Sequence, residues 1–196
     1  MSALKFDEES HVYTLDGIEI PSVTTIIRDV MGNPFEKIRC GEWHMQRGSA
    51  AHAVYELLGQ GEDLSQYDID PTLTPFIENW RDWKNTMQPE IIATEQKVHS
   101  RRMWYAGTLD LLCRENGLLT ILDYKASASR QDRWQLAAYK EALEEKTNAE
   151  IEQAISLQIN EKGWKVTKRL TGSELIAAVK EWKAIRIVAN LKGAKK

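Results

Sequence analysis

The alternation of apolar and polar positions predicts a β-hairpin near the middle of the chain. Residues 106–113 form a short, largely apolar run, and residues 118–124 form a second one. Between them, Glu115-Asn116-Gly117 is typical of a tight turn. We therefore expect two neighbouring antiparallel strands here, within a buried sheet.

Three charged residues interrupt or follow these apolar runs: Asp110, Asp123 and Lys125. Because side chains alternate along a strand, Asp123 and Lys125 share a face, and Asp110 reaches the same side if the two strands pair. Buried charges must be paired or bound to a metal. A D-x-K tripeptide alone is more often a structural ion pair than a catalytic site, so the hypothesis depends on the other motifs.

The remaining periodicity predicts helices and strands in an order typical of an α/β protein. Residues 5–20 indicate a hairpin that turns at Asp16-Gly17. Helices are expected at about residues 23–30, 35–58, 72–87, 131–145 and 173–190, and further strands at about 90–98, 103–110, 150–160 and 164–169. This succession predicts a central mixed β-sheet flanked by helices.

The length of 196 residues fits one domain. Within it we expect an N-terminal hairpin at 1–20, a core that carries the motifs at 21–145, and a strand pair with a basic helix at 146–196. The last 35 residues, 162–196, hold ten Lys or Arg against two Glu, while residues 1–161 carry a net charge of −11. The basic segment suits either contact with a polyanion or a solvated helix face.

Membrane, secretory and zinc-binding classes are disfavoured. No apolar run approaches the ~20 residues that span a bilayer, and the N-terminus lacks an apolar signal segment, so we expect a cytoplasmic protein. Cys40 and Cys113 are far apart and neither belongs to a CxxC pair, which argues against zinc, an iron–sulfur cluster or a disulfide framework.

A motif upstream of the hairpin adds a histidine to the candidate site. Gly48, His52 and Glu56 are spaced four residues apart, so they lie on one face of the predicted helix. A lone histidine on a helix is usually structural, but this one can serve as a third metal ligand.

Two further polar features flank the hairpin. Glu95 is an acid within the predicted strand at 90–98, where a solvent-facing edge charge and a functional carboxylate are equal alternatives. Gln135 and Tyr139 are one turn apart on the helix that follows Lys125, so they face the same way. Alone, their spacing is that of an ordinary amphipathic helix.

Taken in order, these pieces read G-x-x-x-H-x-x-x-E, E, G-x-x-D, D-x-K and Q-x-x-x-Y. This order resembles the PD-(D/E)xK nuclease superfamily, specifically its RecB-type branch, over residues 21–143. The stretch Pro21-Ser22-Val23-Thr24 also resembles mitochondrial genome maintenance exonucleases and small phage-encoded exonucleases. The chain departs from many relatives in having Asp123 in place of Glu, and it lacks both the four cluster-binding cysteines and any helicase motif.

The resemblance implies a restriction-endonuclease-like fold and a divalent-metal site. The oxygen ligands of Asp110 and Asp123 suit Mg²⁺ or Mn²⁺, and the resemblance adds His52 and the Tyr124 carbonyl. Lys125 would hold the attacking water or stabilise developing charge, and its ammonium form is favoured beside two carboxylates. The resemblance further implies that Gln135 and Tyr139 orient Lys125 or the phosphate, with Glu56 and Glu95 outside the first set of ligands and Glu95 a candidate for a second ion.

Nucleic-acid contacts are expected from residues that flank the site in sequence. Four arginines could hold neighbouring phosphates: Arg101, Arg102, Arg130 and Arg133. Three aromatic residues could stack on unpaired bases, with core packing as an equal alternative: Trp104, Tyr105 and Trp134.

The function that the resemblance implies is a DNA exonuclease that prefers free or single-stranded ends, in recombination, repair or phage replication. The expected partner is DNA, with a separate recombinase or single-strand-binding protein as a further candidate and no membrane; a phage-encoded enzyme would work in the host cytoplasm. The alternatives are a sequence-tolerant endonuclease or nickase of the same fold and a non-catalytic DNA-binding module. A nucleotide-binding protein is disfavoured because no Gly-rich phosphate loop is present.

Overall fold

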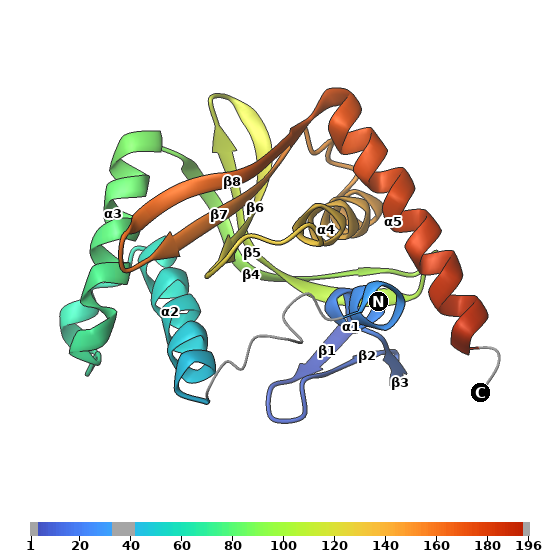
Figure 1. Ribbon diagram of the computed structural model, residues 1–196, viewed down its shortest axis with the longest axis horizontal. Helices are drawn as coiled ribbons and strands as arrows, with labels where there is room; N and C mark the ends of the chain where they lie inside the picture. Colours follow the sequence, from blue (N-terminus) through green and yellow to red (C-terminus); the bar gives the residue numbers. More distant parts are fainter. Residues whose placement is uncertain (1–3, 33–41, 194–196) are drawn as a thin grey trace.

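The computed structural model of the protein describes residues 4–32 and 42–193. It contains a five-stranded sheet with helices on both faces and a smaller three-stranded sheet beside it (Figure 1). The helices are α1 (Val23–Met31), α2 (Glu42–Gln60), α3 (Thr74–Met87), α4 (Asp132–Thr147) and α5 (Gly172–Gly193), with short 3₁₀ helices at Leu64–Gln66 and Pro71–Leu73. In the described part of the chain, none of the helices has the length and apolar character needed to cross a membrane.

The five-stranded sheet confirms the predicted mixed α/β architecture. Its strands follow the order β4 (Glu90–Ser100), β5 (Tyr105–Glu115), β6 (Leu118–Lys125), β7 (Gln153–Asn160) and β8 (Gly163–Thr171). All neighbours are antiparallel except β6 and β7, which are parallel. Parallel neighbours need a crossover, and α4 is that crossover, so it lies directly across the central strands.

The predicted central hairpin is present as β5 and β6. Asn116 and Gly117 at its turn have positive φ of 53° and 83°, the conformation that a two-residue hairpin turn requires. The runs expected separately at 103–110 and 106–113 form one strand, β5.

The helix expected at 35–58 differs at its end. Residues 35–41 lie outside the described residues, and α2 continues through Gly59 to Gln60. A Cβ atom at Gly59 would lie 2.6 Å from Cγ2 of Thr94 in β4. This glycine therefore allows the helix to pack closely on the sheet and does not end the helix.

The N-terminal region forms three strands in place of the expected hairpin. β1 (Leu4–Asp7), β2 (Val12–Leu15) and β3 (Ile18–Ile20) pair antiparallel in this order. The turn at Asp16-Gly17 is where the sequence places it, with φ of 54° and 82°. This small sheet is tied to β5 by a hydrogen bond from Ala106 N to Pro21 O of 3.0 Å.

Two apolar cores lie on the two faces of the large sheet. One core packs α1, α4 and α5 against residues such as Leu109 and Ile121. The other packs α2 and α3 against residues such as Leu111 and Leu122. Figure 1 shows the two pairs of longer helices, α2 with α3 and α4 with α5, on either side of the strands. Both faces of the central strands are therefore buried, and charged groups on them must be compensated.

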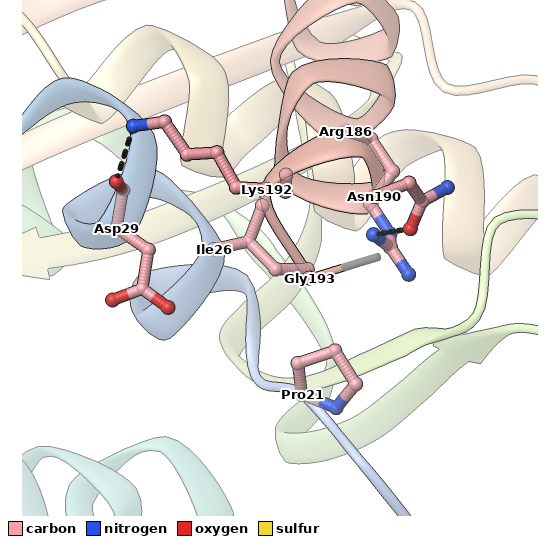
Figure 2. A pocket seen from close by; sticks show the side chains of 8 residues that line it. Pro21, Ile26, Asp29, Arg186, Asn190, Lys192 and Gly193 are labelled. Carbon is pink, nitrogen blue, oxygen red and sulfur yellow. Dashed lines mark hydrogen bonds between the residues drawn. The ribbon is translucent and has the colours of Figure 1, made fainter. Parts of the chain in front are cut away.

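A pocket of about 640 Å³ separates α1 from the C-terminal end of α5 (Figure 2). The buried Arg186 contributes to its wall and donates hydrogen bonds to the carbonyls of Met103 (2.6 Å) and Trp104 (3.0 Å). At the other side of the pocket, Lys192 donates to the Asp29 carbonyl at 2.9 Å. These bonds fasten α5 to α1 and to the β4–β5 turn.

Truncation of Trp182 tests the core between α5 and the sheet. Trp182 is fully buried, and its ring lies 5.0 Å from that of Tyr105 in an edge-on arrangement. We expect Trp182→Ala to lower the free energy of unfolding by about 3–5 kcal/mol, measured by urea denaturation. Ile176→Ala on the same helix is the control, because Ile176 is 55% exposed and its truncation should cost under ~0.5 kcal/mol. Equal midpoints for both variants would contradict this packing.

Candidate active site

Asp110 lies where β5 and β6 separate. The last paired residues of the two strands are Leu111 and Leu122, whereas β6 continues to pair with β7 as far as Lys125. In this opening, the Asp110 carboxylate accepts a 2.6 Å hydrogen bond from the backbone N–H of Tyr124. A side chain thus replaces the missing strand-to-strand bond and brings one acid against the backbone that carries the other.

Lys125 and Asp123 form an ion pair at the C-terminal end of β6. The ammonium lies 2.6 Å from Oδ2 of Asp123, whose side chain is only 2% exposed. Gln135 of α4 fixes this pair: its Oε1 accepts from Lys125 at 2.9 Å and its Nε2 donates to Asp123 at 3.1 Å. The same Nε2 group donates to the Tyr139 hydroxyl at 2.8 Å. The structure therefore joins the D-x-K and Q-x-x-x-Y motifs into one hydrogen-bond network.

The approach of Tyr139 to β5 explains the glycine of the G-x-x-D motif. A Cβ atom at Gly107 would lie 2.6 Å from Cε1 of the Tyr139 ring and 3.4 Å from Val23. Any larger residue would displace this ring and, through its hydroxyl, the Gln135 amide.

A histidine and two carboxylates form a second cluster at the opening between β5 and β6. One ligand atom each from His52, Glu95 and Asp110 lies within 4.8 Å of the other two, close enough to hold a metal ion. His52 Nδ1 is 3.7 Å from Oδ2 of Asp110. Helix α2 thus brings the predicted histidine to the predicted carboxylate.

Glu95 belongs to this cluster, although its position in β4 left an edge charge equally plausible. It stands opposite Asp110, between the register pairs Thr94–Leu111 and Gln96–Leu109. Its φ is +45°, a left-handed conformation that costs a non-glycine residue of order 1 kcal/mol or more. The distorted strand points this carboxylate into the site.

Ionisation of the three carboxyl groups is energetically unfavourable, and their pKa values are raised. Burial, with the nearby charge of Lys125 only partly offsetting it, raises the pKa of Asp110 to about 6. Burial likewise raises the pKa of Asp123 to about 6, with repulsion from Asp110 adding to it. Burial and then repulsion from Asp110 raise the pKa of Glu95 to about 8. A cation placed among these oxygens would relieve the cost, so the donor set fits a divalent ion with oxygen and imidazole ligands.

The two basic groups differ in charge. Burial lowers the pKa of His52, so its imidazole is neutral at pH 7 and can act as a ligand. Burial also lowers the pKa of Lys125, but the charges of Asp123 and Asp110 outweigh it and the net pKa is raised. Lys125 is therefore an ammonium in this site.

A groove lies over Glu95 and Asp110. It consists of two adjoining pockets of about 690 and 550 Å³ that share Phe6, His11, Glu95 and Thr108. The first pocket reaches His52 and Glu56. The Glu56 carboxylate also accepts a 3.1 Å hydrogen bond from Gln60. The second reaches the first turn of α1. We call the two together the active-site groove.

The structure does not bring the predicted stacking residues Tyr105 and Trp134 into this groove. Tyr105 is fully buried, and Trp134 is 5% exposed with its indole N–H donating to Glu181. Trp104 is half-buried and packs against the apolar cluster of the small sheet, which includes Leu15 and Ile20.

The predicted phosphate-binding arginines lie in two places. Arg101 and Arg102 lie in the β4–β5 turn, where their backbone N–H groups donate to Glu145. At least five residues of β5, about 17 Å of strand, lie between this turn and Asp110. Arg133 pairs with Glu181 at 3.2 Å. Arg130 is exposed just before α4, at the end that carries Gln135.

Phe6 and His11 line the groove although their sequence context gave no functional signal. They belong to the short N-terminal sheet and the turn between its first two strands. Nothing in the sequence of a small hairpin shows which part of a distant sheet it covers, so tertiary structure alone reveals this position.

Comparisons with known proteins bear on the origin of this constellation. Among solved structures, the chain matches LHK-Exo in complex with dAMP, with a TM-score of 0.42 and 11% identity over 90% of this chain and 94% of the other. No curated protein matches the chain. Residues 68–191 match the family model of the PD-(D/E)XK nuclease superfamily, as the order of motifs predicted. This match covers more than half of the chain, and the chain belongs to the PD-(D/E)XK nuclease superfamily.

Proposed function

We propose that the protein is a Mg²⁺- or Mn²⁺-dependent deoxyribonuclease that acts as an exonuclease on free or single-stranded DNA ends. The observation that carries this proposal is the network of Asp110, Asp123, Lys125 and Gln135 at the opening between β5 and β6. Membership of the superfamily supports a nuclease. The exonuclease preference rests on the resemblance of the motif order to small exonucleases.

The residues present suggest how a phosphodiester bond would be hydrolysed. His52, Asp110 and Asp123 would hold a divalent ion, with Glu95 beside His52 and Asp110 as a further ligand, and the ion would supply positive charge at the phosphate and a lowered pKa for a bound water. Lys125 would place its ammonium beside the phosphate and stabilise the charge that develops on it. Gln135 holds this ammonium and one Asp123 oxygen together, so it keeps both groups oriented during the reaction.

Substitution of the three central residues tests the site. We expect Asp110→Ala, Asp123→Ala and Lys125→Ala each to lower the rate of DNA cleavage by at least about 10²-fold, because a ligand or a charge stabiliser is lost. Cleavage of end-labelled DNA in Mg²⁺, Mn²⁺ or EDTA measures this. Lys162→Ala, at the exposed β7–β8 turn, should cleave like the unmodified protein. Full cleavage by Asp123→Ala would refute the assignment.

Stability without a metal ion should fall as pH rises. The folded pKa values of about 6 for Asp110 and Asp123 and about 8 for Glu95 exceed those of unfolded carboxyls, so folding takes up protons and stability declines between about pH 4 and 8. A divalent ion replaces those protons. We expect Mn²⁺ to raise Tm by at least ~2 °C more at pH 8 than at pH 5.

Asp110→Asn provides the matched variant for this pH dependence. It removes one of the repelling charges, so its Tm in EDTA at pH 8 should exceed that of the unmodified protein, with the difference shrinking towards pH 4. Its response to Mn²⁺ should be weaker. Thermal melts that show the same metal response at both pH values would contradict the proposed metal site.

The mode of attack is tested with a linear single strand and the same sequence closed into a circle. An exonuclease needs an end, so the circle should resist cleavage while the linear strand is degraded from one terminus. Labels at the 5′ and 3′ ends then give the polarity. If the circle is cut as fast as the linear strand, the protein is an endonuclease. Cleavage of an RNA strand of the same sequence shows which nucleic acid the protein prefers.

A further inference from the structure

Part of the wall of the active-site groove is aromatic. Phe6 of β1 and His11 of the following turn line both pockets of the groove. Phe6 is half-buried and His11 is exposed, so both rings have surface that a ligand can contact. We call these two side chains the aromatic shelf.

The rings of the shelf are held in place by their neighbours. The Phe6 ring lies 4.4 Å from that of Tyr13 and 5.6 Å from the His11 ring, to which it is nearly perpendicular. His11 Nδ1 is 2.9 Å from the Glu8 carbonyl, an acceptor, so this nitrogen carries the proton. Rigid rings lose little conformational entropy when they bind a ligand.

The shelf has a fixed position relative to the carboxylates. The hydroxyl of Tyr13, behind Phe6, is 2.8 Å from that of Thr108 in β5, and Lys97 of β4 places its ammonium 5.6 Å from the centre of the Phe6 ring. Lys97 pairs with Thr108 in the sheet, and Glu95 and Asp110 lie two residues further along the same strands. Two residues of strand span about 7 Å, a distance that one nucleotide can bridge.

We propose that the aromatic shelf stacks the nucleobase of the nucleotide next to the phosphate that a metal ion would hold at Asp110. This inference rests on the proposed function and identifies its substrate as a strand that is unpaired at the cleaved end. Flat rings accept every base, since each base has a π-face, so the subsite tolerates all sequences. A paired base is already stacked within its duplex and must leave it to reach Phe6 and His11.

The surrounding charges favour a base over a second phosphate at this position. Glu8 lines the same part of the groove and would repel a phosphate. The Lys97 ammonium lies 5.6 Å from the centre of the Phe6 ring, so this flexible side chain must move from the ring when a base stacks on it. An uncharged, planar group is therefore the ligand that fits the shelf.

The variants are chosen to remove the rings and keep the fold. Phe6→Leu retains apolar packing against Tyr13 without a flat ring. His11→Asn suits the backbone, because His11 has φ of +55° and Asn tolerates this conformation. Ile18→Ala in the same sheet is the control, since Ile18 is 58% exposed and lies outside the residues that line the groove.

The first measurement is cleavage of linear single strands with one abasic nucleotide, placed in turn at each position near the cleaved end. One position should slow cleavage by about tenfold in the unmodified protein and in Ile18→Ala. In the Phe6→Leu/His11→Asn double variant, intact DNA should be cleaved about tenfold more slowly, with under about twofold further effect of that abasic position. Equal abasic profiles in the double variant and the unmodified protein would overturn the shelf.

The second measurement separates this inference from the proposed nuclease activity. 2-Aminopurine at the sensitive position, or at each position in turn, should lose fluorescence on binding to Lys125→Ala in Mg²⁺, and the added shelf substitutions should abolish this quenching. Quenching without any cleavage by the unmodified protein would support the shelf and refute the nuclease. Cleavage without shelf-dependent quenching would refute the shelf alone.

Discussion

The buried contact between Lys125 and Asp123 is the interaction on which the rest of the site depends. Three carboxylates share a small volume here, and the raised pKa values of Asp123 and Glu95 reflect burial first and then repulsion from Asp110. One ammonium at 2.6 Å from Asp123 offsets part of this cost. Gln135 then fixes the pair from α4, which the parallel arrangement of β6 and β7 places across these strands. The buried carboxylates thus lie in a sheet whose two faces are covered mainly by apolar residues.

The two apolar cores stabilise the fold and offset the unfavourable free energy of burying the charged groups of the site. α2 and α3 cover one face of the sheet, and α4 and α5 cover the other. One helix on each face, α2 or α4, also contributes side chains to the site. His52 comes with α2, while Gln135 and Tyr139 come with α4. Close contacts at Gly59 and Gly107 let both helices approach the strands, so helix packing and site geometry are set by the same small residues.

Much of the fold and of the central site could be predicted from the sequence, because local patterns report local geometry. Alternation identified β6 and the shared face of Asp123 and Lys125, and helical spacing identified Gln135 with Tyr139. Gly59 misled the prediction of a helix end, since its role is tertiary packing against Thr94. Whether Tyr105 and Trp134 faced core or solvent depended on α5, which covers them from a distant part of the chain. The position of Phe6 and His11 over the carboxylates could not be inferred, since it depends on how a separate small sheet docks.

The parallel pairing of β6 with β7 has a consequence for when the protein becomes active during its synthesis. All residues of the hydrogen-bonded network precede residue 140, whereas β7, which holds the far edge of β6, spans Gln153–Asn160. A growing chain that has emerged only as far as α4 contains every one of those side chains but lacks the strand that positions Asp123 and Lys125. We expect such a chain to be inert, so that the ability to cut appears only after β7, in the last quarter of the polypeptide, has left the ribosome and joined the sheet. The order of strands would then protect the cell from an unfinished enzyme.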